Sequence, residues 1–146
     1  MRSRISLQRS QGRLASLWFS GAGLLIALVL AQTVFGKYGS RWNEAWQWLM
    51  PTIAPTSGII IGVLVKDMRQ KRAGSLTVDR FVFRLTMILS AAYLSSVALT
   101  ILLSPFAELH AGMNPLELMA ASHSWLAPFQ GLLTAAMGAF FVSRGD

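Results

Sequence analysis

Residues 17–36 have the sequence LWFSGAGLLIALVLAQTVFG, a window of 20 residues without Asp, Glu, Lys or Arg. A helix of about 20 apolar residues is long enough to cross a hydrocarbon core of roughly 30 Å. Three more windows of this kind occur in the 146-residue chain, at 46–65, 85–104 and 123–142. With their flanking turns, the windows predict four spans at about 17–36, 46–65, 82–104 and 115–142.

The composition also indicates a bilayer as the solvent. Hydrophobic residues make up 53% of the chain and charged residues 13%, whereas soluble proteins carry roughly 25% charged residues. Four apolar helices buried in a soluble core are the alternative, but so short a chain then lacks the charged outer faces that such helices need. We therefore predict an all-α integral membrane four-helix bundle, a single domain over residues 1–146.

Lys and Arg are distributed very unevenly between the two predicted sides. Eleven of the 13 lie in the leader 1–16, in the loop 66–80 with the adjoining Arg84, or at Arg144, and only Lys37 and Arg41 lie on the other side. Because Lys and Arg in short loops stay cytoplasmic, both termini are predicted to face the cytoplasm, with a bacterial inner membrane as the simplest location. A cleaved signal peptide is the alternative for the first window, since residues 29–31 fit a cleavage site.

Small residues recur at helical spacing in the first two windows. Gly23, Ala27 and Ala31 are four residues apart, and Gly58 and Gly62 have the spacing of a membrane helix-pairing motif. Such residues let another helix approach closely, either within one subunit or between subunits. Their number favours self-association into a homo-oligomer.

Prolines are expected to kink two of the helices. Pro51 and Pro55 each lack a backbone N–H, so each leaves one carbonyl of the helix without its usual donor. We expect the hydroxyls of residues 52, 56 and 57 to replace that donor in part. The fourth helix begins with a strong signal, Asn114-Pro115-Leu116-Glu117, which is typical of an N-cap followed by proline at N1 and glutamate at N3. Pro128 is the third predicted kink.

One face of the third helix, continued on the fourth, carries polar side chains. Hydroxyls on a membrane helix either bond to neighbouring helices or line a wet path. Gln130 is the costliest of the set to leave against lipid, so we expect it to face protein or water. The candidate pore or interhelical face comprises Thr86, Ser90, Tyr93, Thr100, Ser104, Gln130 and Thr134.

The cytoplasmic loop is strongly basic. Its cations are expected to lie against anionic lipid headgroups or to dock a cytoplasmic protein partner. No nucleic-acid role is expected, because a short connector offers no fold that reads bases and topology already explains the charge. The residues concerned are Lys66, Arg69, Lys71, Arg72, Arg80 and Arg84.

The sequence contains no recognisable set of catalytic or metal-binding residues. The absence of Cys excludes thiol catalysis and thiolate metal sites, and the two histidines, His110 in an outer loop and His123, do not form a metal or catalytic set. No catalytic, cofactor or metal site is predicted, and the lack of a carboxylate inside the windows disfavours proton-coupled transport of small solutes. We expect a non-enzymatic homo-oligomer that forms a pore or perturbs the membrane, or else an accessory subunit or membrane anchor.

Overall fold

The computed structural model describes residues 4–70 and 77–142. Within these ranges the chain forms five α-helices, one 3-10 helix and a two-stranded ribbon. The elements are β1 (Arg4–Ser6), α1 (Leu7–Val34), η1 (Gly39–Arg41), α2 (Trp42–Gln70), β2 (Thr77–Asp79), α3 (Arg80–Leu102), α4 (Ser104–Ala111) and α5 (Pro115–Val142). The prediction of an all-helical chain is confirmed, apart from the ribbon.

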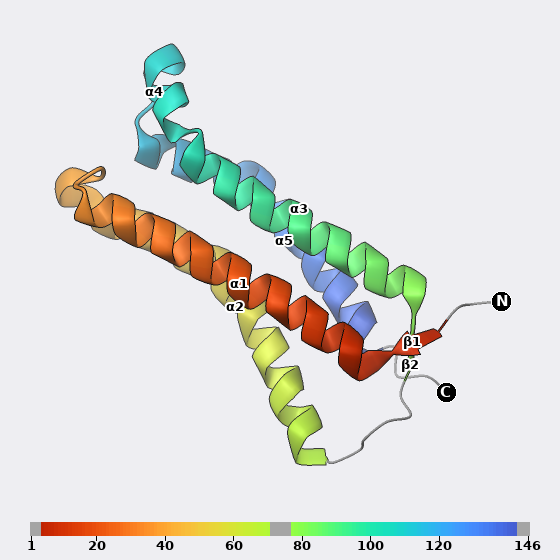
Figure 1. The fold of residues 1–146 in the computed structure, drawn as a ribbon. Helices are drawn as coiled ribbons and strands as arrows, with labels where there is room; N and C mark the ends of the chain where they lie inside the picture. The colour runs from red at the N-terminus through yellow and green to blue at the C-terminus, as the bar shows by residue number, and fades with distance from the viewer. Residues whose placement is uncertain (1–3, 71–76, 143–146) are drawn as a thin grey trace.

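The four long helices lie along one another (Figure 1). The start of α1, the end of α2, the start of α3 and the end of α5 lie toward the end that carries β1 and β2, which we call the ribbon end. α4 lies at the opposite end, which we call the α4 end. Helix α3 packs against α1 and α5, and α2 packs against α1 and α5. In Figure 1 the second half of α2 diverges from α1.

Three described helical segments are long and apolar enough to cross a membrane: Leu7–Val34, Gly39–Lys66 and Arg80–Leu102. The second segment contains the whole of its predicted span, whereas the first helix ends at Val34 rather than at 36 and the third at Leu102 rather than at 104. α3 stops there because Pro105, near the start of α4, has no N–H to continue the ladder. Among the described residues, α5 is not one of these three segments, so the fourth span stays a prediction.

Both predicted cytoplasmic segments contain regular structure that the sequence did not indicate. α1 begins at Leu7 and α2 continues to Gln70, so the helices extend into the leader and into the predicted loop 66–80. β1 then pairs antiparallel with β2, with Ile5 opposite Val78. Val78 is 1% exposed, and Asp79 accepts a hydrogen bond from the Phe81 N–H at 2.8 Å, which caps α3. The ribbon thus closes one end of the helix packing.

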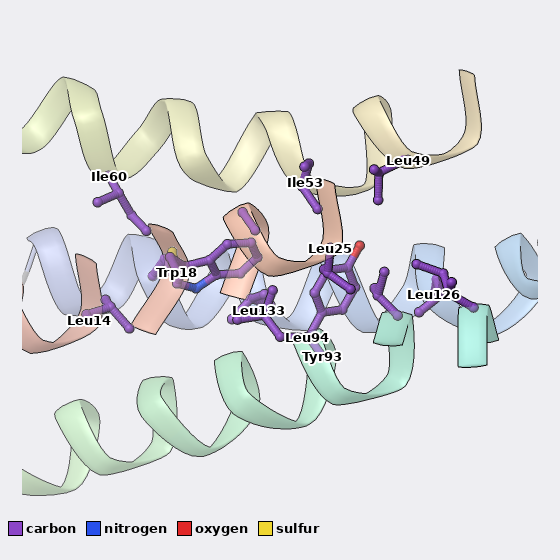
Figure 2. Packing of buried hydrophobic residues seen from close by; sticks show 14 of the residues in the cluster. Leu14, Trp18, Leu25, Leu49, Ile53, Ile60, Tyr93, Leu94, Leu126 and Leu133 are labelled. Carbon is purple, nitrogen blue, oxygen red and sulfur yellow. The ribbon is translucent and has the colours of Figure 1, made fainter. Parts of the chain in front are cut away.

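The interior is built on one face of each helix. Leu14, Trp18, Leu25 and Val29 recur at spacings of four, seven and four along α1, and all are buried. Figure 2 shows Trp18 between α2 and the side chain of Leu133 from α5, with Tyr93 of α3 further toward the α4 end.

Candidate functional site

The most polar part of the interior surrounds residues 48–56 of α2, which we call the proline segment. α2 continues through both Pro51 and Pro55. In an α-helix the N–H of residue 55 would bond to the carbonyl of residue 51, so Pro55 releases the Pro51 carbonyl. The Gln130 side chain of α5 donates its Nε2–H to that carbonyl at 3.4 Å. Gln130 therefore contacts the backbone of α2 through a hydrogen bond that is exposed rather than buried.

The nearby hydroxyls do not satisfy the released carbonyl, contrary to the sequence-based expectation. Thr52 donates to the carbonyl of Trp48 at 2.6 Å, and Ser57 donates to that of Ile53 at 2.9 Å. Each hydroxyl reaches only the preceding turn of its own helix, whose carbonyls differ from the one that Pro55 releases. The partner comes from another helix, which a local pattern cannot reveal.

Two further hydrogen bonds join the proline segment to other helices. The Tyr93 hydroxyl of α3 donates to the Thr52 carbonyl at 3.0 Å. The Trp48 indole donates to Ser122 Oγ of α5 at 2.9 Å, and Ser122 in turn donates to the Met119 carbonyl at 2.6 Å. α2 is therefore held by side chains from both α3 and α5, at a place where its own ladder is interrupted.

The polar face of α3 lies inside the chain. Thr86, Ser90, Tyr93, Thr100 and Ser104 are all buried. Thr86 donates to the Val82 carbonyl at 2.9 Å and lies 3.3 Å from the Ala136 carbonyl of α5. Thr100 donates to its own helix. The face is thus buried inside the chain, and its Thr86 and Tyr93 hydroxyls reach carbonyls of neighbouring helices.

Thr134, the remaining member of the predicted polar face, does not join it. Its side chain is exposed on α5. Pro128 is also exposed, and α5 continues through it without a break in the helix.

A polar cluster at the α4 end was missed by the sequence analysis, which treated Lys37 only as a loop cation. Lys37 Nζ donates to Ser104 Oγ at 2.7 Å, and the Tyr38 hydroxyl donates to Gln32 Oε1. Burial lowers the pKa of Lys37, and the carboxylate of Glu108 opposes this shift. Burial raises the pKa of Tyr38 to about 12. The cluster connects the turn after α1 to the junction of α3 and α4.

The small residues of the helix-pairing patterns lie on the surface of the chain. Gly23, Ala27, Ala31, Gly58 and Gly62 are all exposed. A Cβ added at any of these three glycines would meet no atom within 4 Å. The described part of the chain therefore does not use these positions for its own packing.

The close helix approach inside the chain occurs instead at a glycine outside those patterns. A Cβ added at Gly21 of α1 would lie 2.7 Å from Leu94 Cδ1 of α3. Gly21 lies two residues before Gly23, on another face of the same helix, and nothing in the local sequence distinguishes their roles.

The described cations of the predicted loop are exposed at the ribbon end. Lys66, Arg80 and Arg84 have exposed side chains. The side chain of Arg69 is outside the described part of the structure, as are residues 71 and 72, so the predictions for Arg69, Lys71 and Arg72 fall outside it too.

A shallow groove of about 300 Å³ lies between the first turns of α2 and α5. Glu44, Gln47 and His123 contribute its polar lining, and Glu44 is held by Arg41 in a two-point salt bridge of 2.6 and 2.7 Å. His110 lies in helix α4, not in a loop, because Gly112 in the left-handed conformation ends that helix only after Ala111. Across residues 4–70 and 77–142 no group of acidic and histidine side chains could hold a metal ion.

No family model, curated protein or solved structure matches this chain. The interhelical hydrogen bonds described above hold helices of one chain together.

Proposed function

We propose that the protein is a non-enzymatic integral membrane protein that works as a homo-oligomer, assembled through the small-residue surfaces of α1 and α2. The observation that carries the proposal is the placement of side chains. The polar face of α3 turns inward, while Gly23, Gly58 and Gly62 face outward with free space around them. In lipid, outward-facing small residues favour helix association because they allow backbones to approach closely.

The proposed topology is a four-helix bundle with α5 as the fourth span and both termini in the cytoplasm of a bacterial cell. The topology rests on the 11 Lys and Arg residues of the proposed cytoplasmic side against two on the other side. It also rests on the ribbon, which joins β1 of the leader to β2 of the loop. The exposed Lys66, Arg80 and Arg84 would then lie against anionic headgroups, each contributing roughly 1 kcal/mol.

The test is the oligomeric state in nanodiscs, measured by native mass spectrometry. We expect a defined oligomer for the unmodified protein and a monomer when Gly58→Leu and Gly62→Leu are combined, because two large side chains block close approach. Gly131→Leu on α5 is the matched control, since its surroundings are equally open. A monomeric unmodified protein, or equal loss of assembly in the control, contradicts the proposed surface.

Pore formation is a narrower version of the same proposal. A path lined by the α3 hydroxyls requires them to face between subunits, whereas Thr86 and Tyr93 contact α5 and α2 of their own chain. We therefore favour assembly, or perturbation of the bilayer by the assembled protein, over conduction along α3. Dye release from liposomes at high protein density tests both kinds of leak, because tight vesicles would exclude pore formation and bilayer perturbation and leave assembly alone.

An accessory subunit or membrane anchor is the second candidate. The exposed cations at the ribbon end, among them Arg9, Arg13, Arg80 and Arg84, favour it because they offer a surface for an acidic cytoplasmic protein. This function requires a partner that copurifies in fixed stoichiometry. Arg80→Glu combined with Arg84→Glu should then release the partner without changing self-association.

A further inference from the structure

Helix α4 carries large apolar side chains on a face that no other part of the described chain covers. Phe106 is 58% exposed and Leu109 is 79% exposed. The two residues lie three positions apart in an eight-residue helix, so their side chains project from the same side of it. Large apolar side chains that share an exposed face require an apolar surface to contact.

The opposite side of α4 holds its polar contacts with the rest of the protein. Ser104 is fully buried, and its Oγ accepts from Lys37 Nζ at 2.7 Å. Glu108 lies one turn later on the same side, and its carboxylate attracts the Lys37 ammonium. At about 100° per residue, Phe106 and Leu109 lie on the far side of the helix. The polar side of α4 is therefore held against the protein, whereas the apolar side is turned away from it.

α4 also lies at the level where the long apolar helices end. α1 ends at Val34 and α3 at Leu102, and α4 begins two residues after α3. Figure 1 shows that α4 turns away from the axis of α3 rather than continuing it. Leu99, Leu102 and Leu103 are exposed at the end of α3, so the apolar outer surface of that helix continues onto α4. Leu103 shares a shallow groove with Trp125 of α5, a residue type that prefers the headgroup layer.

The small size of this apolar face favours lipid over a protein as its partner. A stable protein interface buries about 800 Å² on each side, which is far more than the side chains of Phe106 and Leu109 offer. An interfacial helix needs only one apolar face, which enters the boundary between headgroups and acyl chains. The continuity with the outer surface of α3 indicates the same partner, because lipid covers that surface if α3 spans the membrane.

We infer that α4 is an interfacial helix in the headgroup layer of the leaflet at the α4 end, with Phe106 and Leu109 inserted toward the acyl chains. The inference rests on the proposed membrane function and adds a specific lipid contact to it. Because α4 contains no Lys or Arg, its insertion is apolar and does not require anionic lipid, unlike the contacts proposed at the ribbon end. Lys37 determines which side of α4 faces the bilayer, through its bond to Ser104.

Spin labels on single introduced cysteines measure the depth of α4, because the chain contains no Cys of its own. Leu109→Cys and Ala111→Cys place the label at two exposed positions on different sides of the helix. In nanodiscs of zwitterionic lipid, the label at residue 109 should be accessible to oxygen, which concentrates among acyl chains, and protected from a water-soluble nickel complex. The label at residue 111, the matched control, should show the reverse preference. Addition of anionic lipid should leave this contrast unchanged, and a contrast that appears only with anionic lipid would overturn the inference.

A label in the middle of α1 separates failure of this inference from failure of the proposed membrane function. Leu24 is exposed there, so the label of Leu24→Cys should be protected from the nickel complex if α1 spans the bilayer. Protection at residue 24 with nickel access at residue 109 would overturn the interfacial position of α4 alone. Nickel access at both residues would contradict the membrane function as well. Exclusion of both oxygen and nickel at residue 109 would show that protein, not lipid, covers α4, and would also overturn the inference.

The orienting role of Lys37 has a separate test. Lys37→Met removes the donor to Ser104, so the contrast between the labels at residues 109 and 111 should be lost. Lys37→Arg keeps a charged donor and should retain the contrast. An unchanged contrast in the Lys37→Met protein would overturn the role of Lys37 in orienting α4.

Discussion

At the scale of single residues, Gln130 and Pro55 form a compensating pair. Pro55 removes the donor that the Pro51 carbonyl would normally receive, and Gln130 supplies another from α5. Gln130→Leu should therefore lower the free energy of unfolding in detergent by about 0.6–2 kcal/mol. In the presence of Pro55→Ala the same substitution should cost almost nothing, because the introduced alanine restores the backbone donor.

Pro51→Ala is the control for this pair. It restores a donor to the carbonyl of Gln47 rather than to that of Pro51, so it should not rescue Gln130→Leu. Equal rescue by both alanine substitutions would show that general straightening of α2, rather than one carbonyl, is responsible.

Tyr38 gives the protein a defined response to alkaline pH. Its pKa is raised from 10.0 to about 12, so between these values the unfolded chain loses the phenolic proton while the folded chain keeps it. The folded state then binds more protons, and its stability falls as pH rises from about 10 to 12. Tyr38→Phe should flatten that part of the stability profile. Lys37, whose pKa is lowered by burial, is present in both proteins and serves as a common background.

A direct titration gives an independent measurement. The chain has two tyrosines, so the Tyr93→Phe variant reports Tyr38 alone through its phenolate absorbance. A midpoint near 10 in the folded variant would show that burial does not hold the proton.

At the scale of elements, α5 depends on its first turn. Asn114 Oδ1 accepts from the N–H groups of Leu116 and Glu117 at 3.0 Å, and Glu117 Oε2 accepts from the Asn114 N–H at 3.0 Å, which confirms the predicted cap. Asn114→Ala should lower the free energy of unfolding by about 1 kcal/mol, measured by thermal or denaturant unfolding. Asn43→Ala in the first turn of α2, where no cap was predicted, is the comparison and should have a clearly smaller effect.

The contrast between this cap and the ribbon shows what the sequence can predict. Cap and helix lengths follow from neighbouring residues, so the start of α5 at Pro115 could be predicted directly. The ribbon pairs Ile5 with Val78, and a pairing between two three-residue strands so far apart has no local signal. The partner of the Pro51 carbonyl and the tight contact at Gly21 were unpredictable for the same reason, because both depend on which helices become neighbours.

At the scale of the whole molecule, the inner and outer faces of the helices carry different kinds of residue. Tyr93 and Trp48 direct their polar groups inward, where a lost hydrogen bond is costly, whereas the hydrogen bond from Gln130 to α2 is exposed. The small residues are left on the outside, where substitution leaves the packing of one chain intact. A change at Gly58 should therefore affect assembly, whereas a change at Gly21 should affect folding.

The proposed orientation in the membrane rests on the distribution of Lys and Arg, and it is open to a clean test because the chain contains no Cys. Gln8 at the start of α1 and Ser40 in η1 are both exposed and lie at opposite ends of the first apolar helix. A membrane-impermeant maleimide applied to intact spheroplasts should label the Ser40→Cys protein at once. It should label the Gln8→Cys protein only after the membrane is permeabilised, because the positive leader stays in the cytoplasm. The reverse order would invert the proposed topology, and labelling of both variants before permeabilisation would mean that α1 does not cross the bilayer.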